Sequence, residues 1–160
     1  MKIIILLLCS FSGISLVLPA PENHPPRREI RLIATRIIDG DTFEGRANDS
    51  TFRIRLNGID APERGQDFYN VSKQRLGELC NDSPLKVSLY NKDRYGRWIA
   101  DVTNKSNVHI NYRLVEEGLA WHYKKYSADT LLAALEEKAR AAKSGIWITK
   151  NPIAPWIKRN

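Results

Sequence analysis

The feature that most constrains the fold of this chain is an alternation of apolar and polar residues in the segment from position 51 to position 59. Phe52, Ile54 and Leu56 occupy one set of alternate positions, and polar side chains, Arg55 among them, occupy the other. Successive side chains of a β-strand point to opposite faces of the sheet, so a period of two is typical of a strand with one buried face. We therefore expect Arg55 to face away from Phe52 and Leu56.

Other segments have the composition of strands. Residues 32–38 are rich in β-branched and aliphatic side chains and run into a turn at residues 39–42, which predicts a hairpin with a short second strand. Residues 85–90 and 98–103 return to the same composition. Together with the strand at 51–59 this makes five strands, a number that can close into a small barrel.

Three segments have helical signals. Apolar residues recur at helical spacing between residues 68 and 79. Asn111 is expected to cap a second helix that stops at Gly118, and Ser127 to cap a third that stops at Gly145. The third helix has an expected buried stripe of Leu131, Leu132, Leu135 and Ala139, with Glu136 and Arg140 as a surface pair.

The order of these elements, three strands, a helix, two strands and two helices, predicts an α+β domain built on a five-stranded Greek-key barrel with three α-helices. A chain of 160 residues with 42% hydrophobic side chains is long enough for one core and too short for two ordinary domains. We place the domain at residues 31–148, after a flexible segment at residues 21–30 that contains three prolines. Residues 149–160 form a C-terminal tail with Trp156 and three cations.

Residues 1–20 are typical of an export signal. A single Lys2 precedes a largely apolar, uncharged run from residue 3 to residue 18, shorter than the roughly 20 residues that a membrane-spanning helix needs. We prefer cleavage after Ala20, with cleavage after Ser15 or an uncleaved anchor as alternatives. The sequence thus predicts an exported protein, periplasmic or secreted, with no stable membrane association after removal of the signal.

The chain is basic, with a formal net charge of +7, or one charge less once Lys2 is removed with the signal. A basic domain associates faster with polyanions and gains affinity by releasing counterions from phosphates, so nucleic acid is a natural partner. The alternative is that the charge serves solubility. Of the two cysteines only Cys80 follows the signal, so no internal disulfide can form and the fold depends on its core. We expect a monomer.

Four carboxylates lie at the predicted strand ends and turns, namely Asp39, Asp41, Asp60 and Glu63. Neighbouring glycine and proline residues permit or fix sharp backbone geometry there. Hard oxygen ligands held by rigid turns suit Ca²⁺ or Mg²⁺. The alternative is that the Asp and Gly residues only form turns. The metal hypothesis requires that the separate turns meet in space.

Two arginines could complete a hydrolytic site. Hydrolysis of a phosphodiester needs an activated water, neutralisation of charge on the phosphoryl oxygens and a cation near the leaving group. Glu63 can act as a general base, and Arg55 and Arg97 can donate paired hydrogen bonds to a phosphate. The alternative, that both arginines are ordinary surface residues, is not rejected by their spacing.

Three segments in order resemble the signatures of the staphylococcal nuclease (thermonuclease) family. They are Ile-Ile-Asp-Gly-Asp-Thr at 37–42, Ile-Arg-Leu-Asn-Gly-Ile-Asp-Ala-Pro-Glu at 54–63 and Asp-Arg-Tyr-Gly-Arg at 93–97. The similarity continues through Glu-Gly-Leu-Ala at 117–120 and Ser-Gly-Ile-Trp at 144–147, so it covers about residues 31–148. Three ordered motifs rarely coincide by chance, which makes the resemblance specific.

The resemblance implies an OB-type barrel that binds Ca²⁺ and hydrolyses DNA and RNA with little sequence preference, leaving 3′-phosphates. The implied ligands of the ion are the carboxylates of Asp41 and Asp60 and the backbone carbonyl of Ala61, with Asp39 behind them. The implied catalytic residues are Arg55, Glu63 and Arg97. The implied substrate-binding residues are Arg94, Tyr95 and Tyr126. Aromatic faces accept any base by stacking, although Tyr126 could equally belong to the core.

The chain departs from the staphylococcal pattern in two places. Ala61 stands where the staphylococcal pattern has Thr. The segment between Glu63 and the first helix is shorter than in that pattern and lacks its lysine-rich loop. The first change preserves a carbonyl ligand, and the second bears on substrate preference and affinity. Two alternatives remain: a noncatalytic nucleic-acid-binding module, and a nuclease that depends on Mg²⁺ or a transition metal. Because Mg²⁺ demands a tighter octahedral shell, Ca²⁺ is the ion we expect.

Overall fold

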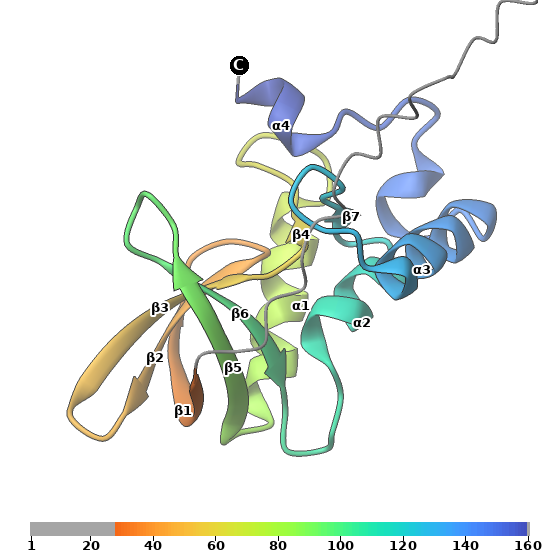
Figure 1. The fold of residues 1–160 in the computed structure, drawn as a ribbon. Coiled ribbons are helices and arrows are strands. Elements are labelled where there is room, and N and C mark those ends of the chain that lie inside the picture. The colour runs from red at the N-terminus through yellow and green to blue at the C-terminus, as the bar shows by residue number, and fades with distance from the viewer. Residues whose placement is uncertain (1–27, 160) are drawn as a thin grey trace, which may run out of the picture.

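The centre of the molecule is a closed β-barrel whose strands follow the order β1-β2-β3-β6-β5 (Figure 1). The computed structural model describes residues 28–159. The barrel strands are β1 (Arg28–Ile37), β2 (Thr42–Ala47), β3 (Ser50–Leu56), β5 (Leu85–Lys92) and β6 (Trp98–Thr103), while β4 (Ile59–Asp60) and β7 (Trp121–His122) pair separately. The helices are α1 (Tyr69–Asn81), α2 (Ile110–Glu116), α3 (Thr130–Ala141), the 3₁₀ helix η1 (Gly145–Ile148) and the single turn α4 (Pro155–Lys158). The predicted five-stranded barrel with three longer helices is confirmed.

The barrel closes through one parallel pair of strands. β3 and β6 run parallel, with Arg55 opposite Ile99, whereas the neighbouring pairs are antiparallel. β1 serves two neighbours: its first half pairs with β5 and its second half with β2, with a register shift between Ala34 and Arg36. A shift of this kind bends a strand and increases its twist. One long strand therefore curves around the barrel and ends beside β2, where the acidic turn begins.

The alternation in β3 divides its side chains between the core and the candidate site. Ile54 and Leu56 are 0% and 1% exposed and pack in the core cluster with Phe43. Arg55 points to the other face but is also buried. Helix α1 contacts β1 and α2, and α2 contacts β6 and α3, so the helices cover one side of the barrel (Figure 1). The prediction that Arg55 faces away from the apolar residues is confirmed.

A second, smaller core holds the C-terminal part of the chain. It consists of Trp121, Ala139, Ile146, Trp147 and Ala154, with Phe68 and Trp156 packed against it. The η1 turn joins this core by close backbone contact, because the N–H of Ile146 donates to the carbonyl of Gly118 at 2.9 Å. A side chain at Gly145, which has a φ of +54°, would collide with the backbone of Gly118. The tail after η1 is thus packed on the domain.

Two boundary predictions were wrong. The segment at residues 21–30 was expected to be flexible, but Arg28, Glu29 and Ile30 belong to β1 and pair with β5. The domain therefore begins at or before residue 28, because the end of β5 needs a partner strand that composition alone did not reveal. The third helix is capped by Asp129, whose Oδ1 accepts from the N–H groups of Leu131 and Leu132, and not by Ser127.

Two side-chain assignments were also wrong. Asn111 does not cap α2, whose N-cap is His109. It is fully buried, accepting from the N–H of Val102 at 3.1 Å and donating to the carbonyl of Asn57 at 3.0 Å. Glu136 was expected on the surface but is 1% exposed. Its carboxylate accepts from the N–H of His122, the last residue of β7. In the predicted stripe of α3, Leu131 is exposed.

The expected export signal at residues 1–20 lies outside the described residues, as do its cleavage alternatives. Between residues 28 and 159, no helix combines the length and the apolar character needed to cross a membrane.

Candidate active site

The turn between β1 and β2 carries Asp39 and Asp41. The N–H of Asp39 donates to the carbonyl of Thr42 at 3.3 Å, and the N–H of Asp41 donates to Oδ1 of Asp39 at 3.0 Å. Gly40 lies between the two acids, where a Cβ would come within 2.7 Å of the Cβ of Ala61. The turn can therefore pack against the segment that follows β4 only with glycine at this position.

The second acidic segment lies directly against the first. The N–H of Ala61 donates to Oδ2 of Asp41 at 2.7 Å. Asp60 precedes it as the last residue of β4 and pairs with Trp121 of β7. Asp41 and Asp60 are 6% and 0% exposed. Carboxylates from two separate turns thus meet below the surface, as the metal hypothesis requires.

Arg55 joins the two acids. Its Nε lies 3.2 Å from Oδ1 of Asp41, and its Nη2 donates to Oδ1 of Asp60 at 2.8 Å. A third contact, from Nη1 to the carbonyl of Leu56 at 2.8 Å, fixes the plane of the guanidinium group. Arginine carries five N–H donors, so two are left for another ligand. The interpretation of Arg55 as an ordinary surface residue is wrong, because the residue is 8% exposed.

The carboxylates are not fully neutralised by the cations around them. Burial, followed by the negative charge of Asp41, raises the pKa of Asp39 to about 7. Burial also raises the pKa of Asp60, although Arg159 and Arg55 act in the opposite direction. A carboxyl group whose pKa rises despite a neighbouring guanidinium lies where its charged form is poorly solvated. Additional positive charge at this position would stabilise the ionised acids.

The donor set fits a hard divalent cation. Carboxylate and carbonyl oxygens are the ligands that Ca²⁺ and Mg²⁺ take in proteins. Asp41 and Asp60, with the peptide of Ala61 between them, are the residues that would hold it. In the described part of the chain no group of three or more His, Cys, Asp or Glu side chains is arranged to bind a metal. An ion here therefore needs carbonyl or water oxygens to complete its coordination.

Glu63 lies in the irregular segment between β4 and α1. Its N–H donates to Oε1 of Gln66 at 2.7 Å, and its own carbonyl accepts from the N–H of Gln66 at 2.9 Å. The side chain is 37% exposed, so water reaches the carboxylate. Its Oε1 accepts from Nη1 of Arg159 at 2.5 Å. Glu63 thus stands at the edge of the acid cluster, linked to Asp60 by a shared guanidinium.

Arg97 approaches the cluster from the turn between β5 and β6. Its Nε donates to Oδ2 of Asp93 at 2.7 Å, and its backbone N–H donates to Oδ1 of the same residue at 3.0 Å. Its Nη1 lies 3.5 Å from Oγ1 of Thr42, which in turn donates to Oδ1 of Asp41 at 3.0 Å. Arg97 is therefore one side chain away from Asp41 and is held in place by an acid of its own turn.

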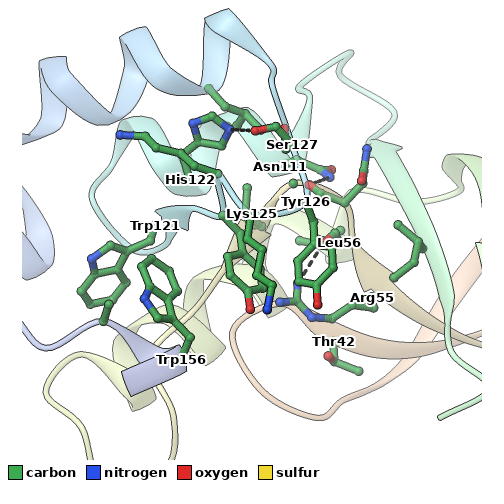
Figure 2. A pocket seen from close by; sticks show the side chains of 18 of the residues that line it. Thr42, Arg55, Leu56, Asn111, Trp121, His122, Lys125, Tyr126, Ser127 and Trp156 are labelled. Atoms are coloured by element: carbon green, nitrogen blue, oxygen red, sulfur yellow. Dashed lines mark hydrogen bonds between the residues drawn. The ribbon is translucent and has the colours of Figure 1, made fainter. Parts of the chain in front are cut away.

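These groups border one open cleft of about 2250 Å³, whose lining includes Asp39, Arg55, Glu63 and Arg97. Figure 2 shows Arg55 and Thr42 on the barrel side of the cleft and Tyr126 facing them. Asp41, Asp60 and Ala61 lie behind this lining. A phosphate in the cleft can therefore meet the arginines and Glu63 directly.

The three predicted substrate-binding residues also line the cleft. Arg94 donates from Nη2 to the hydroxyl of Tyr95 at 2.7 Å, and both side chains are exposed. Tyr126 is 66% exposed, so the alternative that it belongs to the core is wrong. Its ring meets that of Tyr123 edge to face at 4.9 Å. All three offer surfaces that a nucleotide could contact.

Sequence reasoning missed the tail residues that reach this site. Arg159 donates to both Asp60 and Glu63. Trp156 stacks on Tyr123, with ring centres 5.1 Å apart and planes 5° from parallel. Gln66 connects the Glu63 segment to the tail. A tryptophan and cations in a short C-terminal segment gave the only signal, and no spacing rule connects them to acids nearly a hundred residues away.

Comparison with known proteins gives a consistent family relationship. Residues 53–149 match the family described as staphylococcal nuclease homologue. An uncharacterized endonuclease of Escherichia coli O157:H7 is 37% identical over 125 residues, which cover 78% of this chain and 82% of the relative. A micrococcal nuclease of Shigella flexneri is 36% identical over 144 residues, 82% of each chain. A probable staphylococcal-like nuclease, CAN1, of Oryza sativa subsp. japonica is 36% identical over 105 residues, 66% of this chain and 31% of the relative.

Proposed function

Because this chain belongs to the staphylococcal nuclease homologue family, we propose that it is a calcium-dependent nuclease that hydrolyses DNA and RNA with little sequence preference and leaves 3′-phosphates. The observation that carries the proposal is the position of Arg55, which contacts both Asp41 and Asp60 and borders the cleft. A phosphate in the cleft would thus meet the guanidinium group of Arg55, with the two buried acids behind it. Such a pairing has little purpose in a core.

The acids are proposed to hold the cation. Asp41 and Asp60, with the carbonyl of Ala61, would bind it, and Asp39 would orient Asp41 through the hydrogen bond from the Asp41 N–H. A bound divalent ion supplies Lewis-acid stabilisation of charge on the phosphoryl oxygens and lowers the pKa of a bound water. We prefer Ca²⁺ because two carboxylates, a carbonyl and waters form the flexible shell that the larger ion accepts.

The arginines are proposed to bind the phosphate. Arg55 retains two unused N–H donors, and Arg97 is held by Asp93 at the rim of the same cleft. Both can donate to the phosphoryl oxygens as negative charge builds in the transition state. Glu63 is exposed enough to accept a proton from the attacking water. Attack on phosphorus then breaks the bond to the 5′ oxygen, and the phosphate stays on the 3′ side.

The remaining cleft residues are proposed to bind the nucleotide. Arg94 and Tyr95 lie beyond Arg97 on the same turn and would contact a terminal phosphate. Tyr126 presents an exposed ring, and aromatic stacking does not distinguish bases strongly. Little sequence preference follows if this ring, and not a set of hydrogen-bonding side chains, carries the base contact.

The proposal is tested by incubating the purified protein with single-stranded DNA or RNA in Ca²⁺ and, separately, in a chelator. We expect cleavage with Ca²⁺, none with the chelator, and 3′-phosphate ends in the products. Intact nucleic acid in both samples would overturn the nuclease proposal and leave the noncatalytic nucleic-acid-binding module as the alternative. Full activity with Mg²⁺ and none with Ca²⁺ would reverse the choice of ion.

A further inference from the structure

The C-terminal tail returns to the acid cluster and is fastened to the segment that carries Glu63. Nε2 of Gln66 donates to the carbonyl of Ile153 at 2.8 Å, and Nζ of Lys158 donates to the carbonyl of Arg64 at 2.7 Å. Figure 1 shows α4 beside the loop that joins β4 to α1. The tail and this loop therefore form one surface at the edge of the cleft.

Arg159, at the end of α4, contacts the buried carboxylate of Asp60 directly. Its Nη2 donates to Oδ2 of Asp60 at 2.5 Å, and its Nη1 lies 3.2 Å from Oδ1 of the same group and 2.5 Å from Oε1 of Glu63. Arg55 contacts Oδ1 of Asp60 as well. Asp60 is completely buried. Both of its oxygens are thus taken by guanidinium groups, and one of those groups comes from the tail.

A divalent cation at Asp60 is in competition with this arrangement. A carboxylate offers about four lone-pair positions, and three N–H donors already point at Asp60. A second cation a few ångströms from Arg159 is also repelled by it, and this repulsion is strong where water is excluded. Arg55 is fixed by contacts to Asp41 and Leu56, so Arg159 is the partner that must give way.

We propose that Arg159 is a tethered counter-ion of the site, which pairs with Asp60 and Glu63 until a divalent cation at Asp60 displaces it. The proposal rests on the proposed function in one respect, namely that the cation binds at Asp60. Displacement also releases Glu63 from its guanidinium partner. The tail thereby makes the ion pairing of Glu63 depend on the presence of the cation. No motif in the sequence indicates this dependence.

The tail is built for a local displacement. The side chain of Arg159 is 42% exposed, and α4 is a single turn. Farther back, Ala154 is buried and Trp156 is stacked on Tyr123, so the tail stays anchored when its last residues move. Tethering keeps the guanidinium at high effective concentration. The bound cation and Arg159 weaken each other's binding to Asp60. By linkage, the free energy by which the cation weakens the Arg159 contacts equals the free energy by which Arg159 weakens cation binding.

Calcium titration of the apo-protein by isothermal calorimetry, without nucleic acid, tests the competition. Arg159→Gln is expected to lower the Kd for Ca²⁺ by about five-fold or more, the lower range of coupling between sites. Lys150→Gln is the matched control, since it removes an exposed cation of the same tail that forms no ion pair among residues 28–159. It is expected to change the Kd by less than about two-fold, because exposed charges are screened.

A stop after Lys158 gives a second variant, which removes Arg159 together with Asn160 without introducing a new side chain and should also lower the Kd. An unchanged or higher Kd in both variants, with calcium binding intact, would overturn the role of Arg159 and leave the proposed function standing. Absence of calcium binding in the wild-type protein would overturn both. Hydrogen exchange provides a readout independent of affinity: Ca²⁺ should speed exchange in the peptide that contains residues 157–159, and slower or unchanged exchange would contradict displacement.

Discussion

Two carboxylates of this protein, Glu44 and Asp60, are each held between two arginines, and the comparison separates a structural ion pair from a functional one. Glu44 lies on the outer surface of β2, where Nε of Arg36 is 3.0 Å from Oε2 and Nη2 of Arg53 is 2.7 Å from Oε1. Its hydrogen bonds to Arg36 and Arg53 lower its pKa to about 2. The Glu44 side chain is 19% exposed, so water still reaches it, and the group behaves as a surface acid with good partners.

Asp60 has equivalent arginine partners, but its pKa shifts in the opposite direction. Arg55 and Arg159 approach it to 2.8 and 2.5 Å, as closely as the partners of Glu44, yet burial outweighs them and raises its pKa. Removing a carboxylate from water costs several kcal/mol, which ion pairing offsets only in part. Burial, and not the number of arginines, therefore marks Asp60 as the group that would gain most from a divalent cation.

The largest expected effect separates these two acids. Asp60→Asn should lower the rate of DNA cleavage by at least about 10³-fold and abolish calcium binding, since it removes a proposed ligand whose ion supplies several kcal/mol of transition-state stabilisation. Glu44→Gln should leave both properties unchanged. Cleavage assays and calorimetry on the two variants check this, and a similar loss in both would remove the distinction.

Glu63 and Arg97 test the chemistry at the edge of the buried cluster. Glu63→Gln should lower kcat by about 10²–10⁴-fold, the usual contribution of a general base. Arg97→Ala should lower it by about 10²–10³-fold through loss of a donor to the phosphate. Circular dichroism should show folded protein in both cases. Unfolding of either variant would mean that the residue is structural.

Arg55 and Arg53 are two positions apart on β3, and they sharpen the comparison in terms of stability. Arg55→Met leaves Asp41 and Asp60 with less counter-charge in a buried site, so we expect a loss of about 3–5 kcal/mol in the free energy of unfolding. Arg53→Met removes only an exposed partner of Glu44 and should cost less than about 1 kcal/mol. Denaturant unfolding measures both, and equal losses would contradict the assignment.

The smallest effect concerns pH and Glu44. Its pKa is lower in the folded protein than in a free side chain, so its ion pairs stabilise the fold at neutral pH and lose this contribution as the pH falls towards about 2. Glu44→Gln should therefore lower Tm by less than about 4 °C at pH 7. The difference from the wild-type protein should shrink as the pH falls below about 4.5. A difference that grows in acid would have the wrong sign.

The sequence predicted those parts of the molecule that follow from local rules. The alternation in β3 assigned Ile54 and Leu56 to the core and Arg55 to the opposite face, because a strand side chain has only two directions. The acids at Asp41 and Asp60 were recognised from the turns beside them, although the structure was needed to show that the turns meet.

The errors came from partners that are distant in the chain. Glu136 has the spacing of a surface residue but is buried because it accepts from the backbone N–H of His122. Asn111 looked like a helix cap but satisfies backbone groups of β6 and of the segment after β3. Arg159 reaches Asp60 only because the tail is anchored by the second core. Periodicity and capping rules describe neighbours in sequence, so they could not predict these contacts.

The most direct test of the central claim is a crystal structure of the protein soaked with Ca²⁺ and a nucleoside 3′,5′-bisphosphate. We expect the ion to be bound by Asp41 and Asp60, with a phosphate within hydrogen-bonding distance of both Arg55 and Arg97. An ion bound elsewhere, or a phosphate out of reach of both arginines, would contradict the proposal that these acids and arginines form one hydrolytic site.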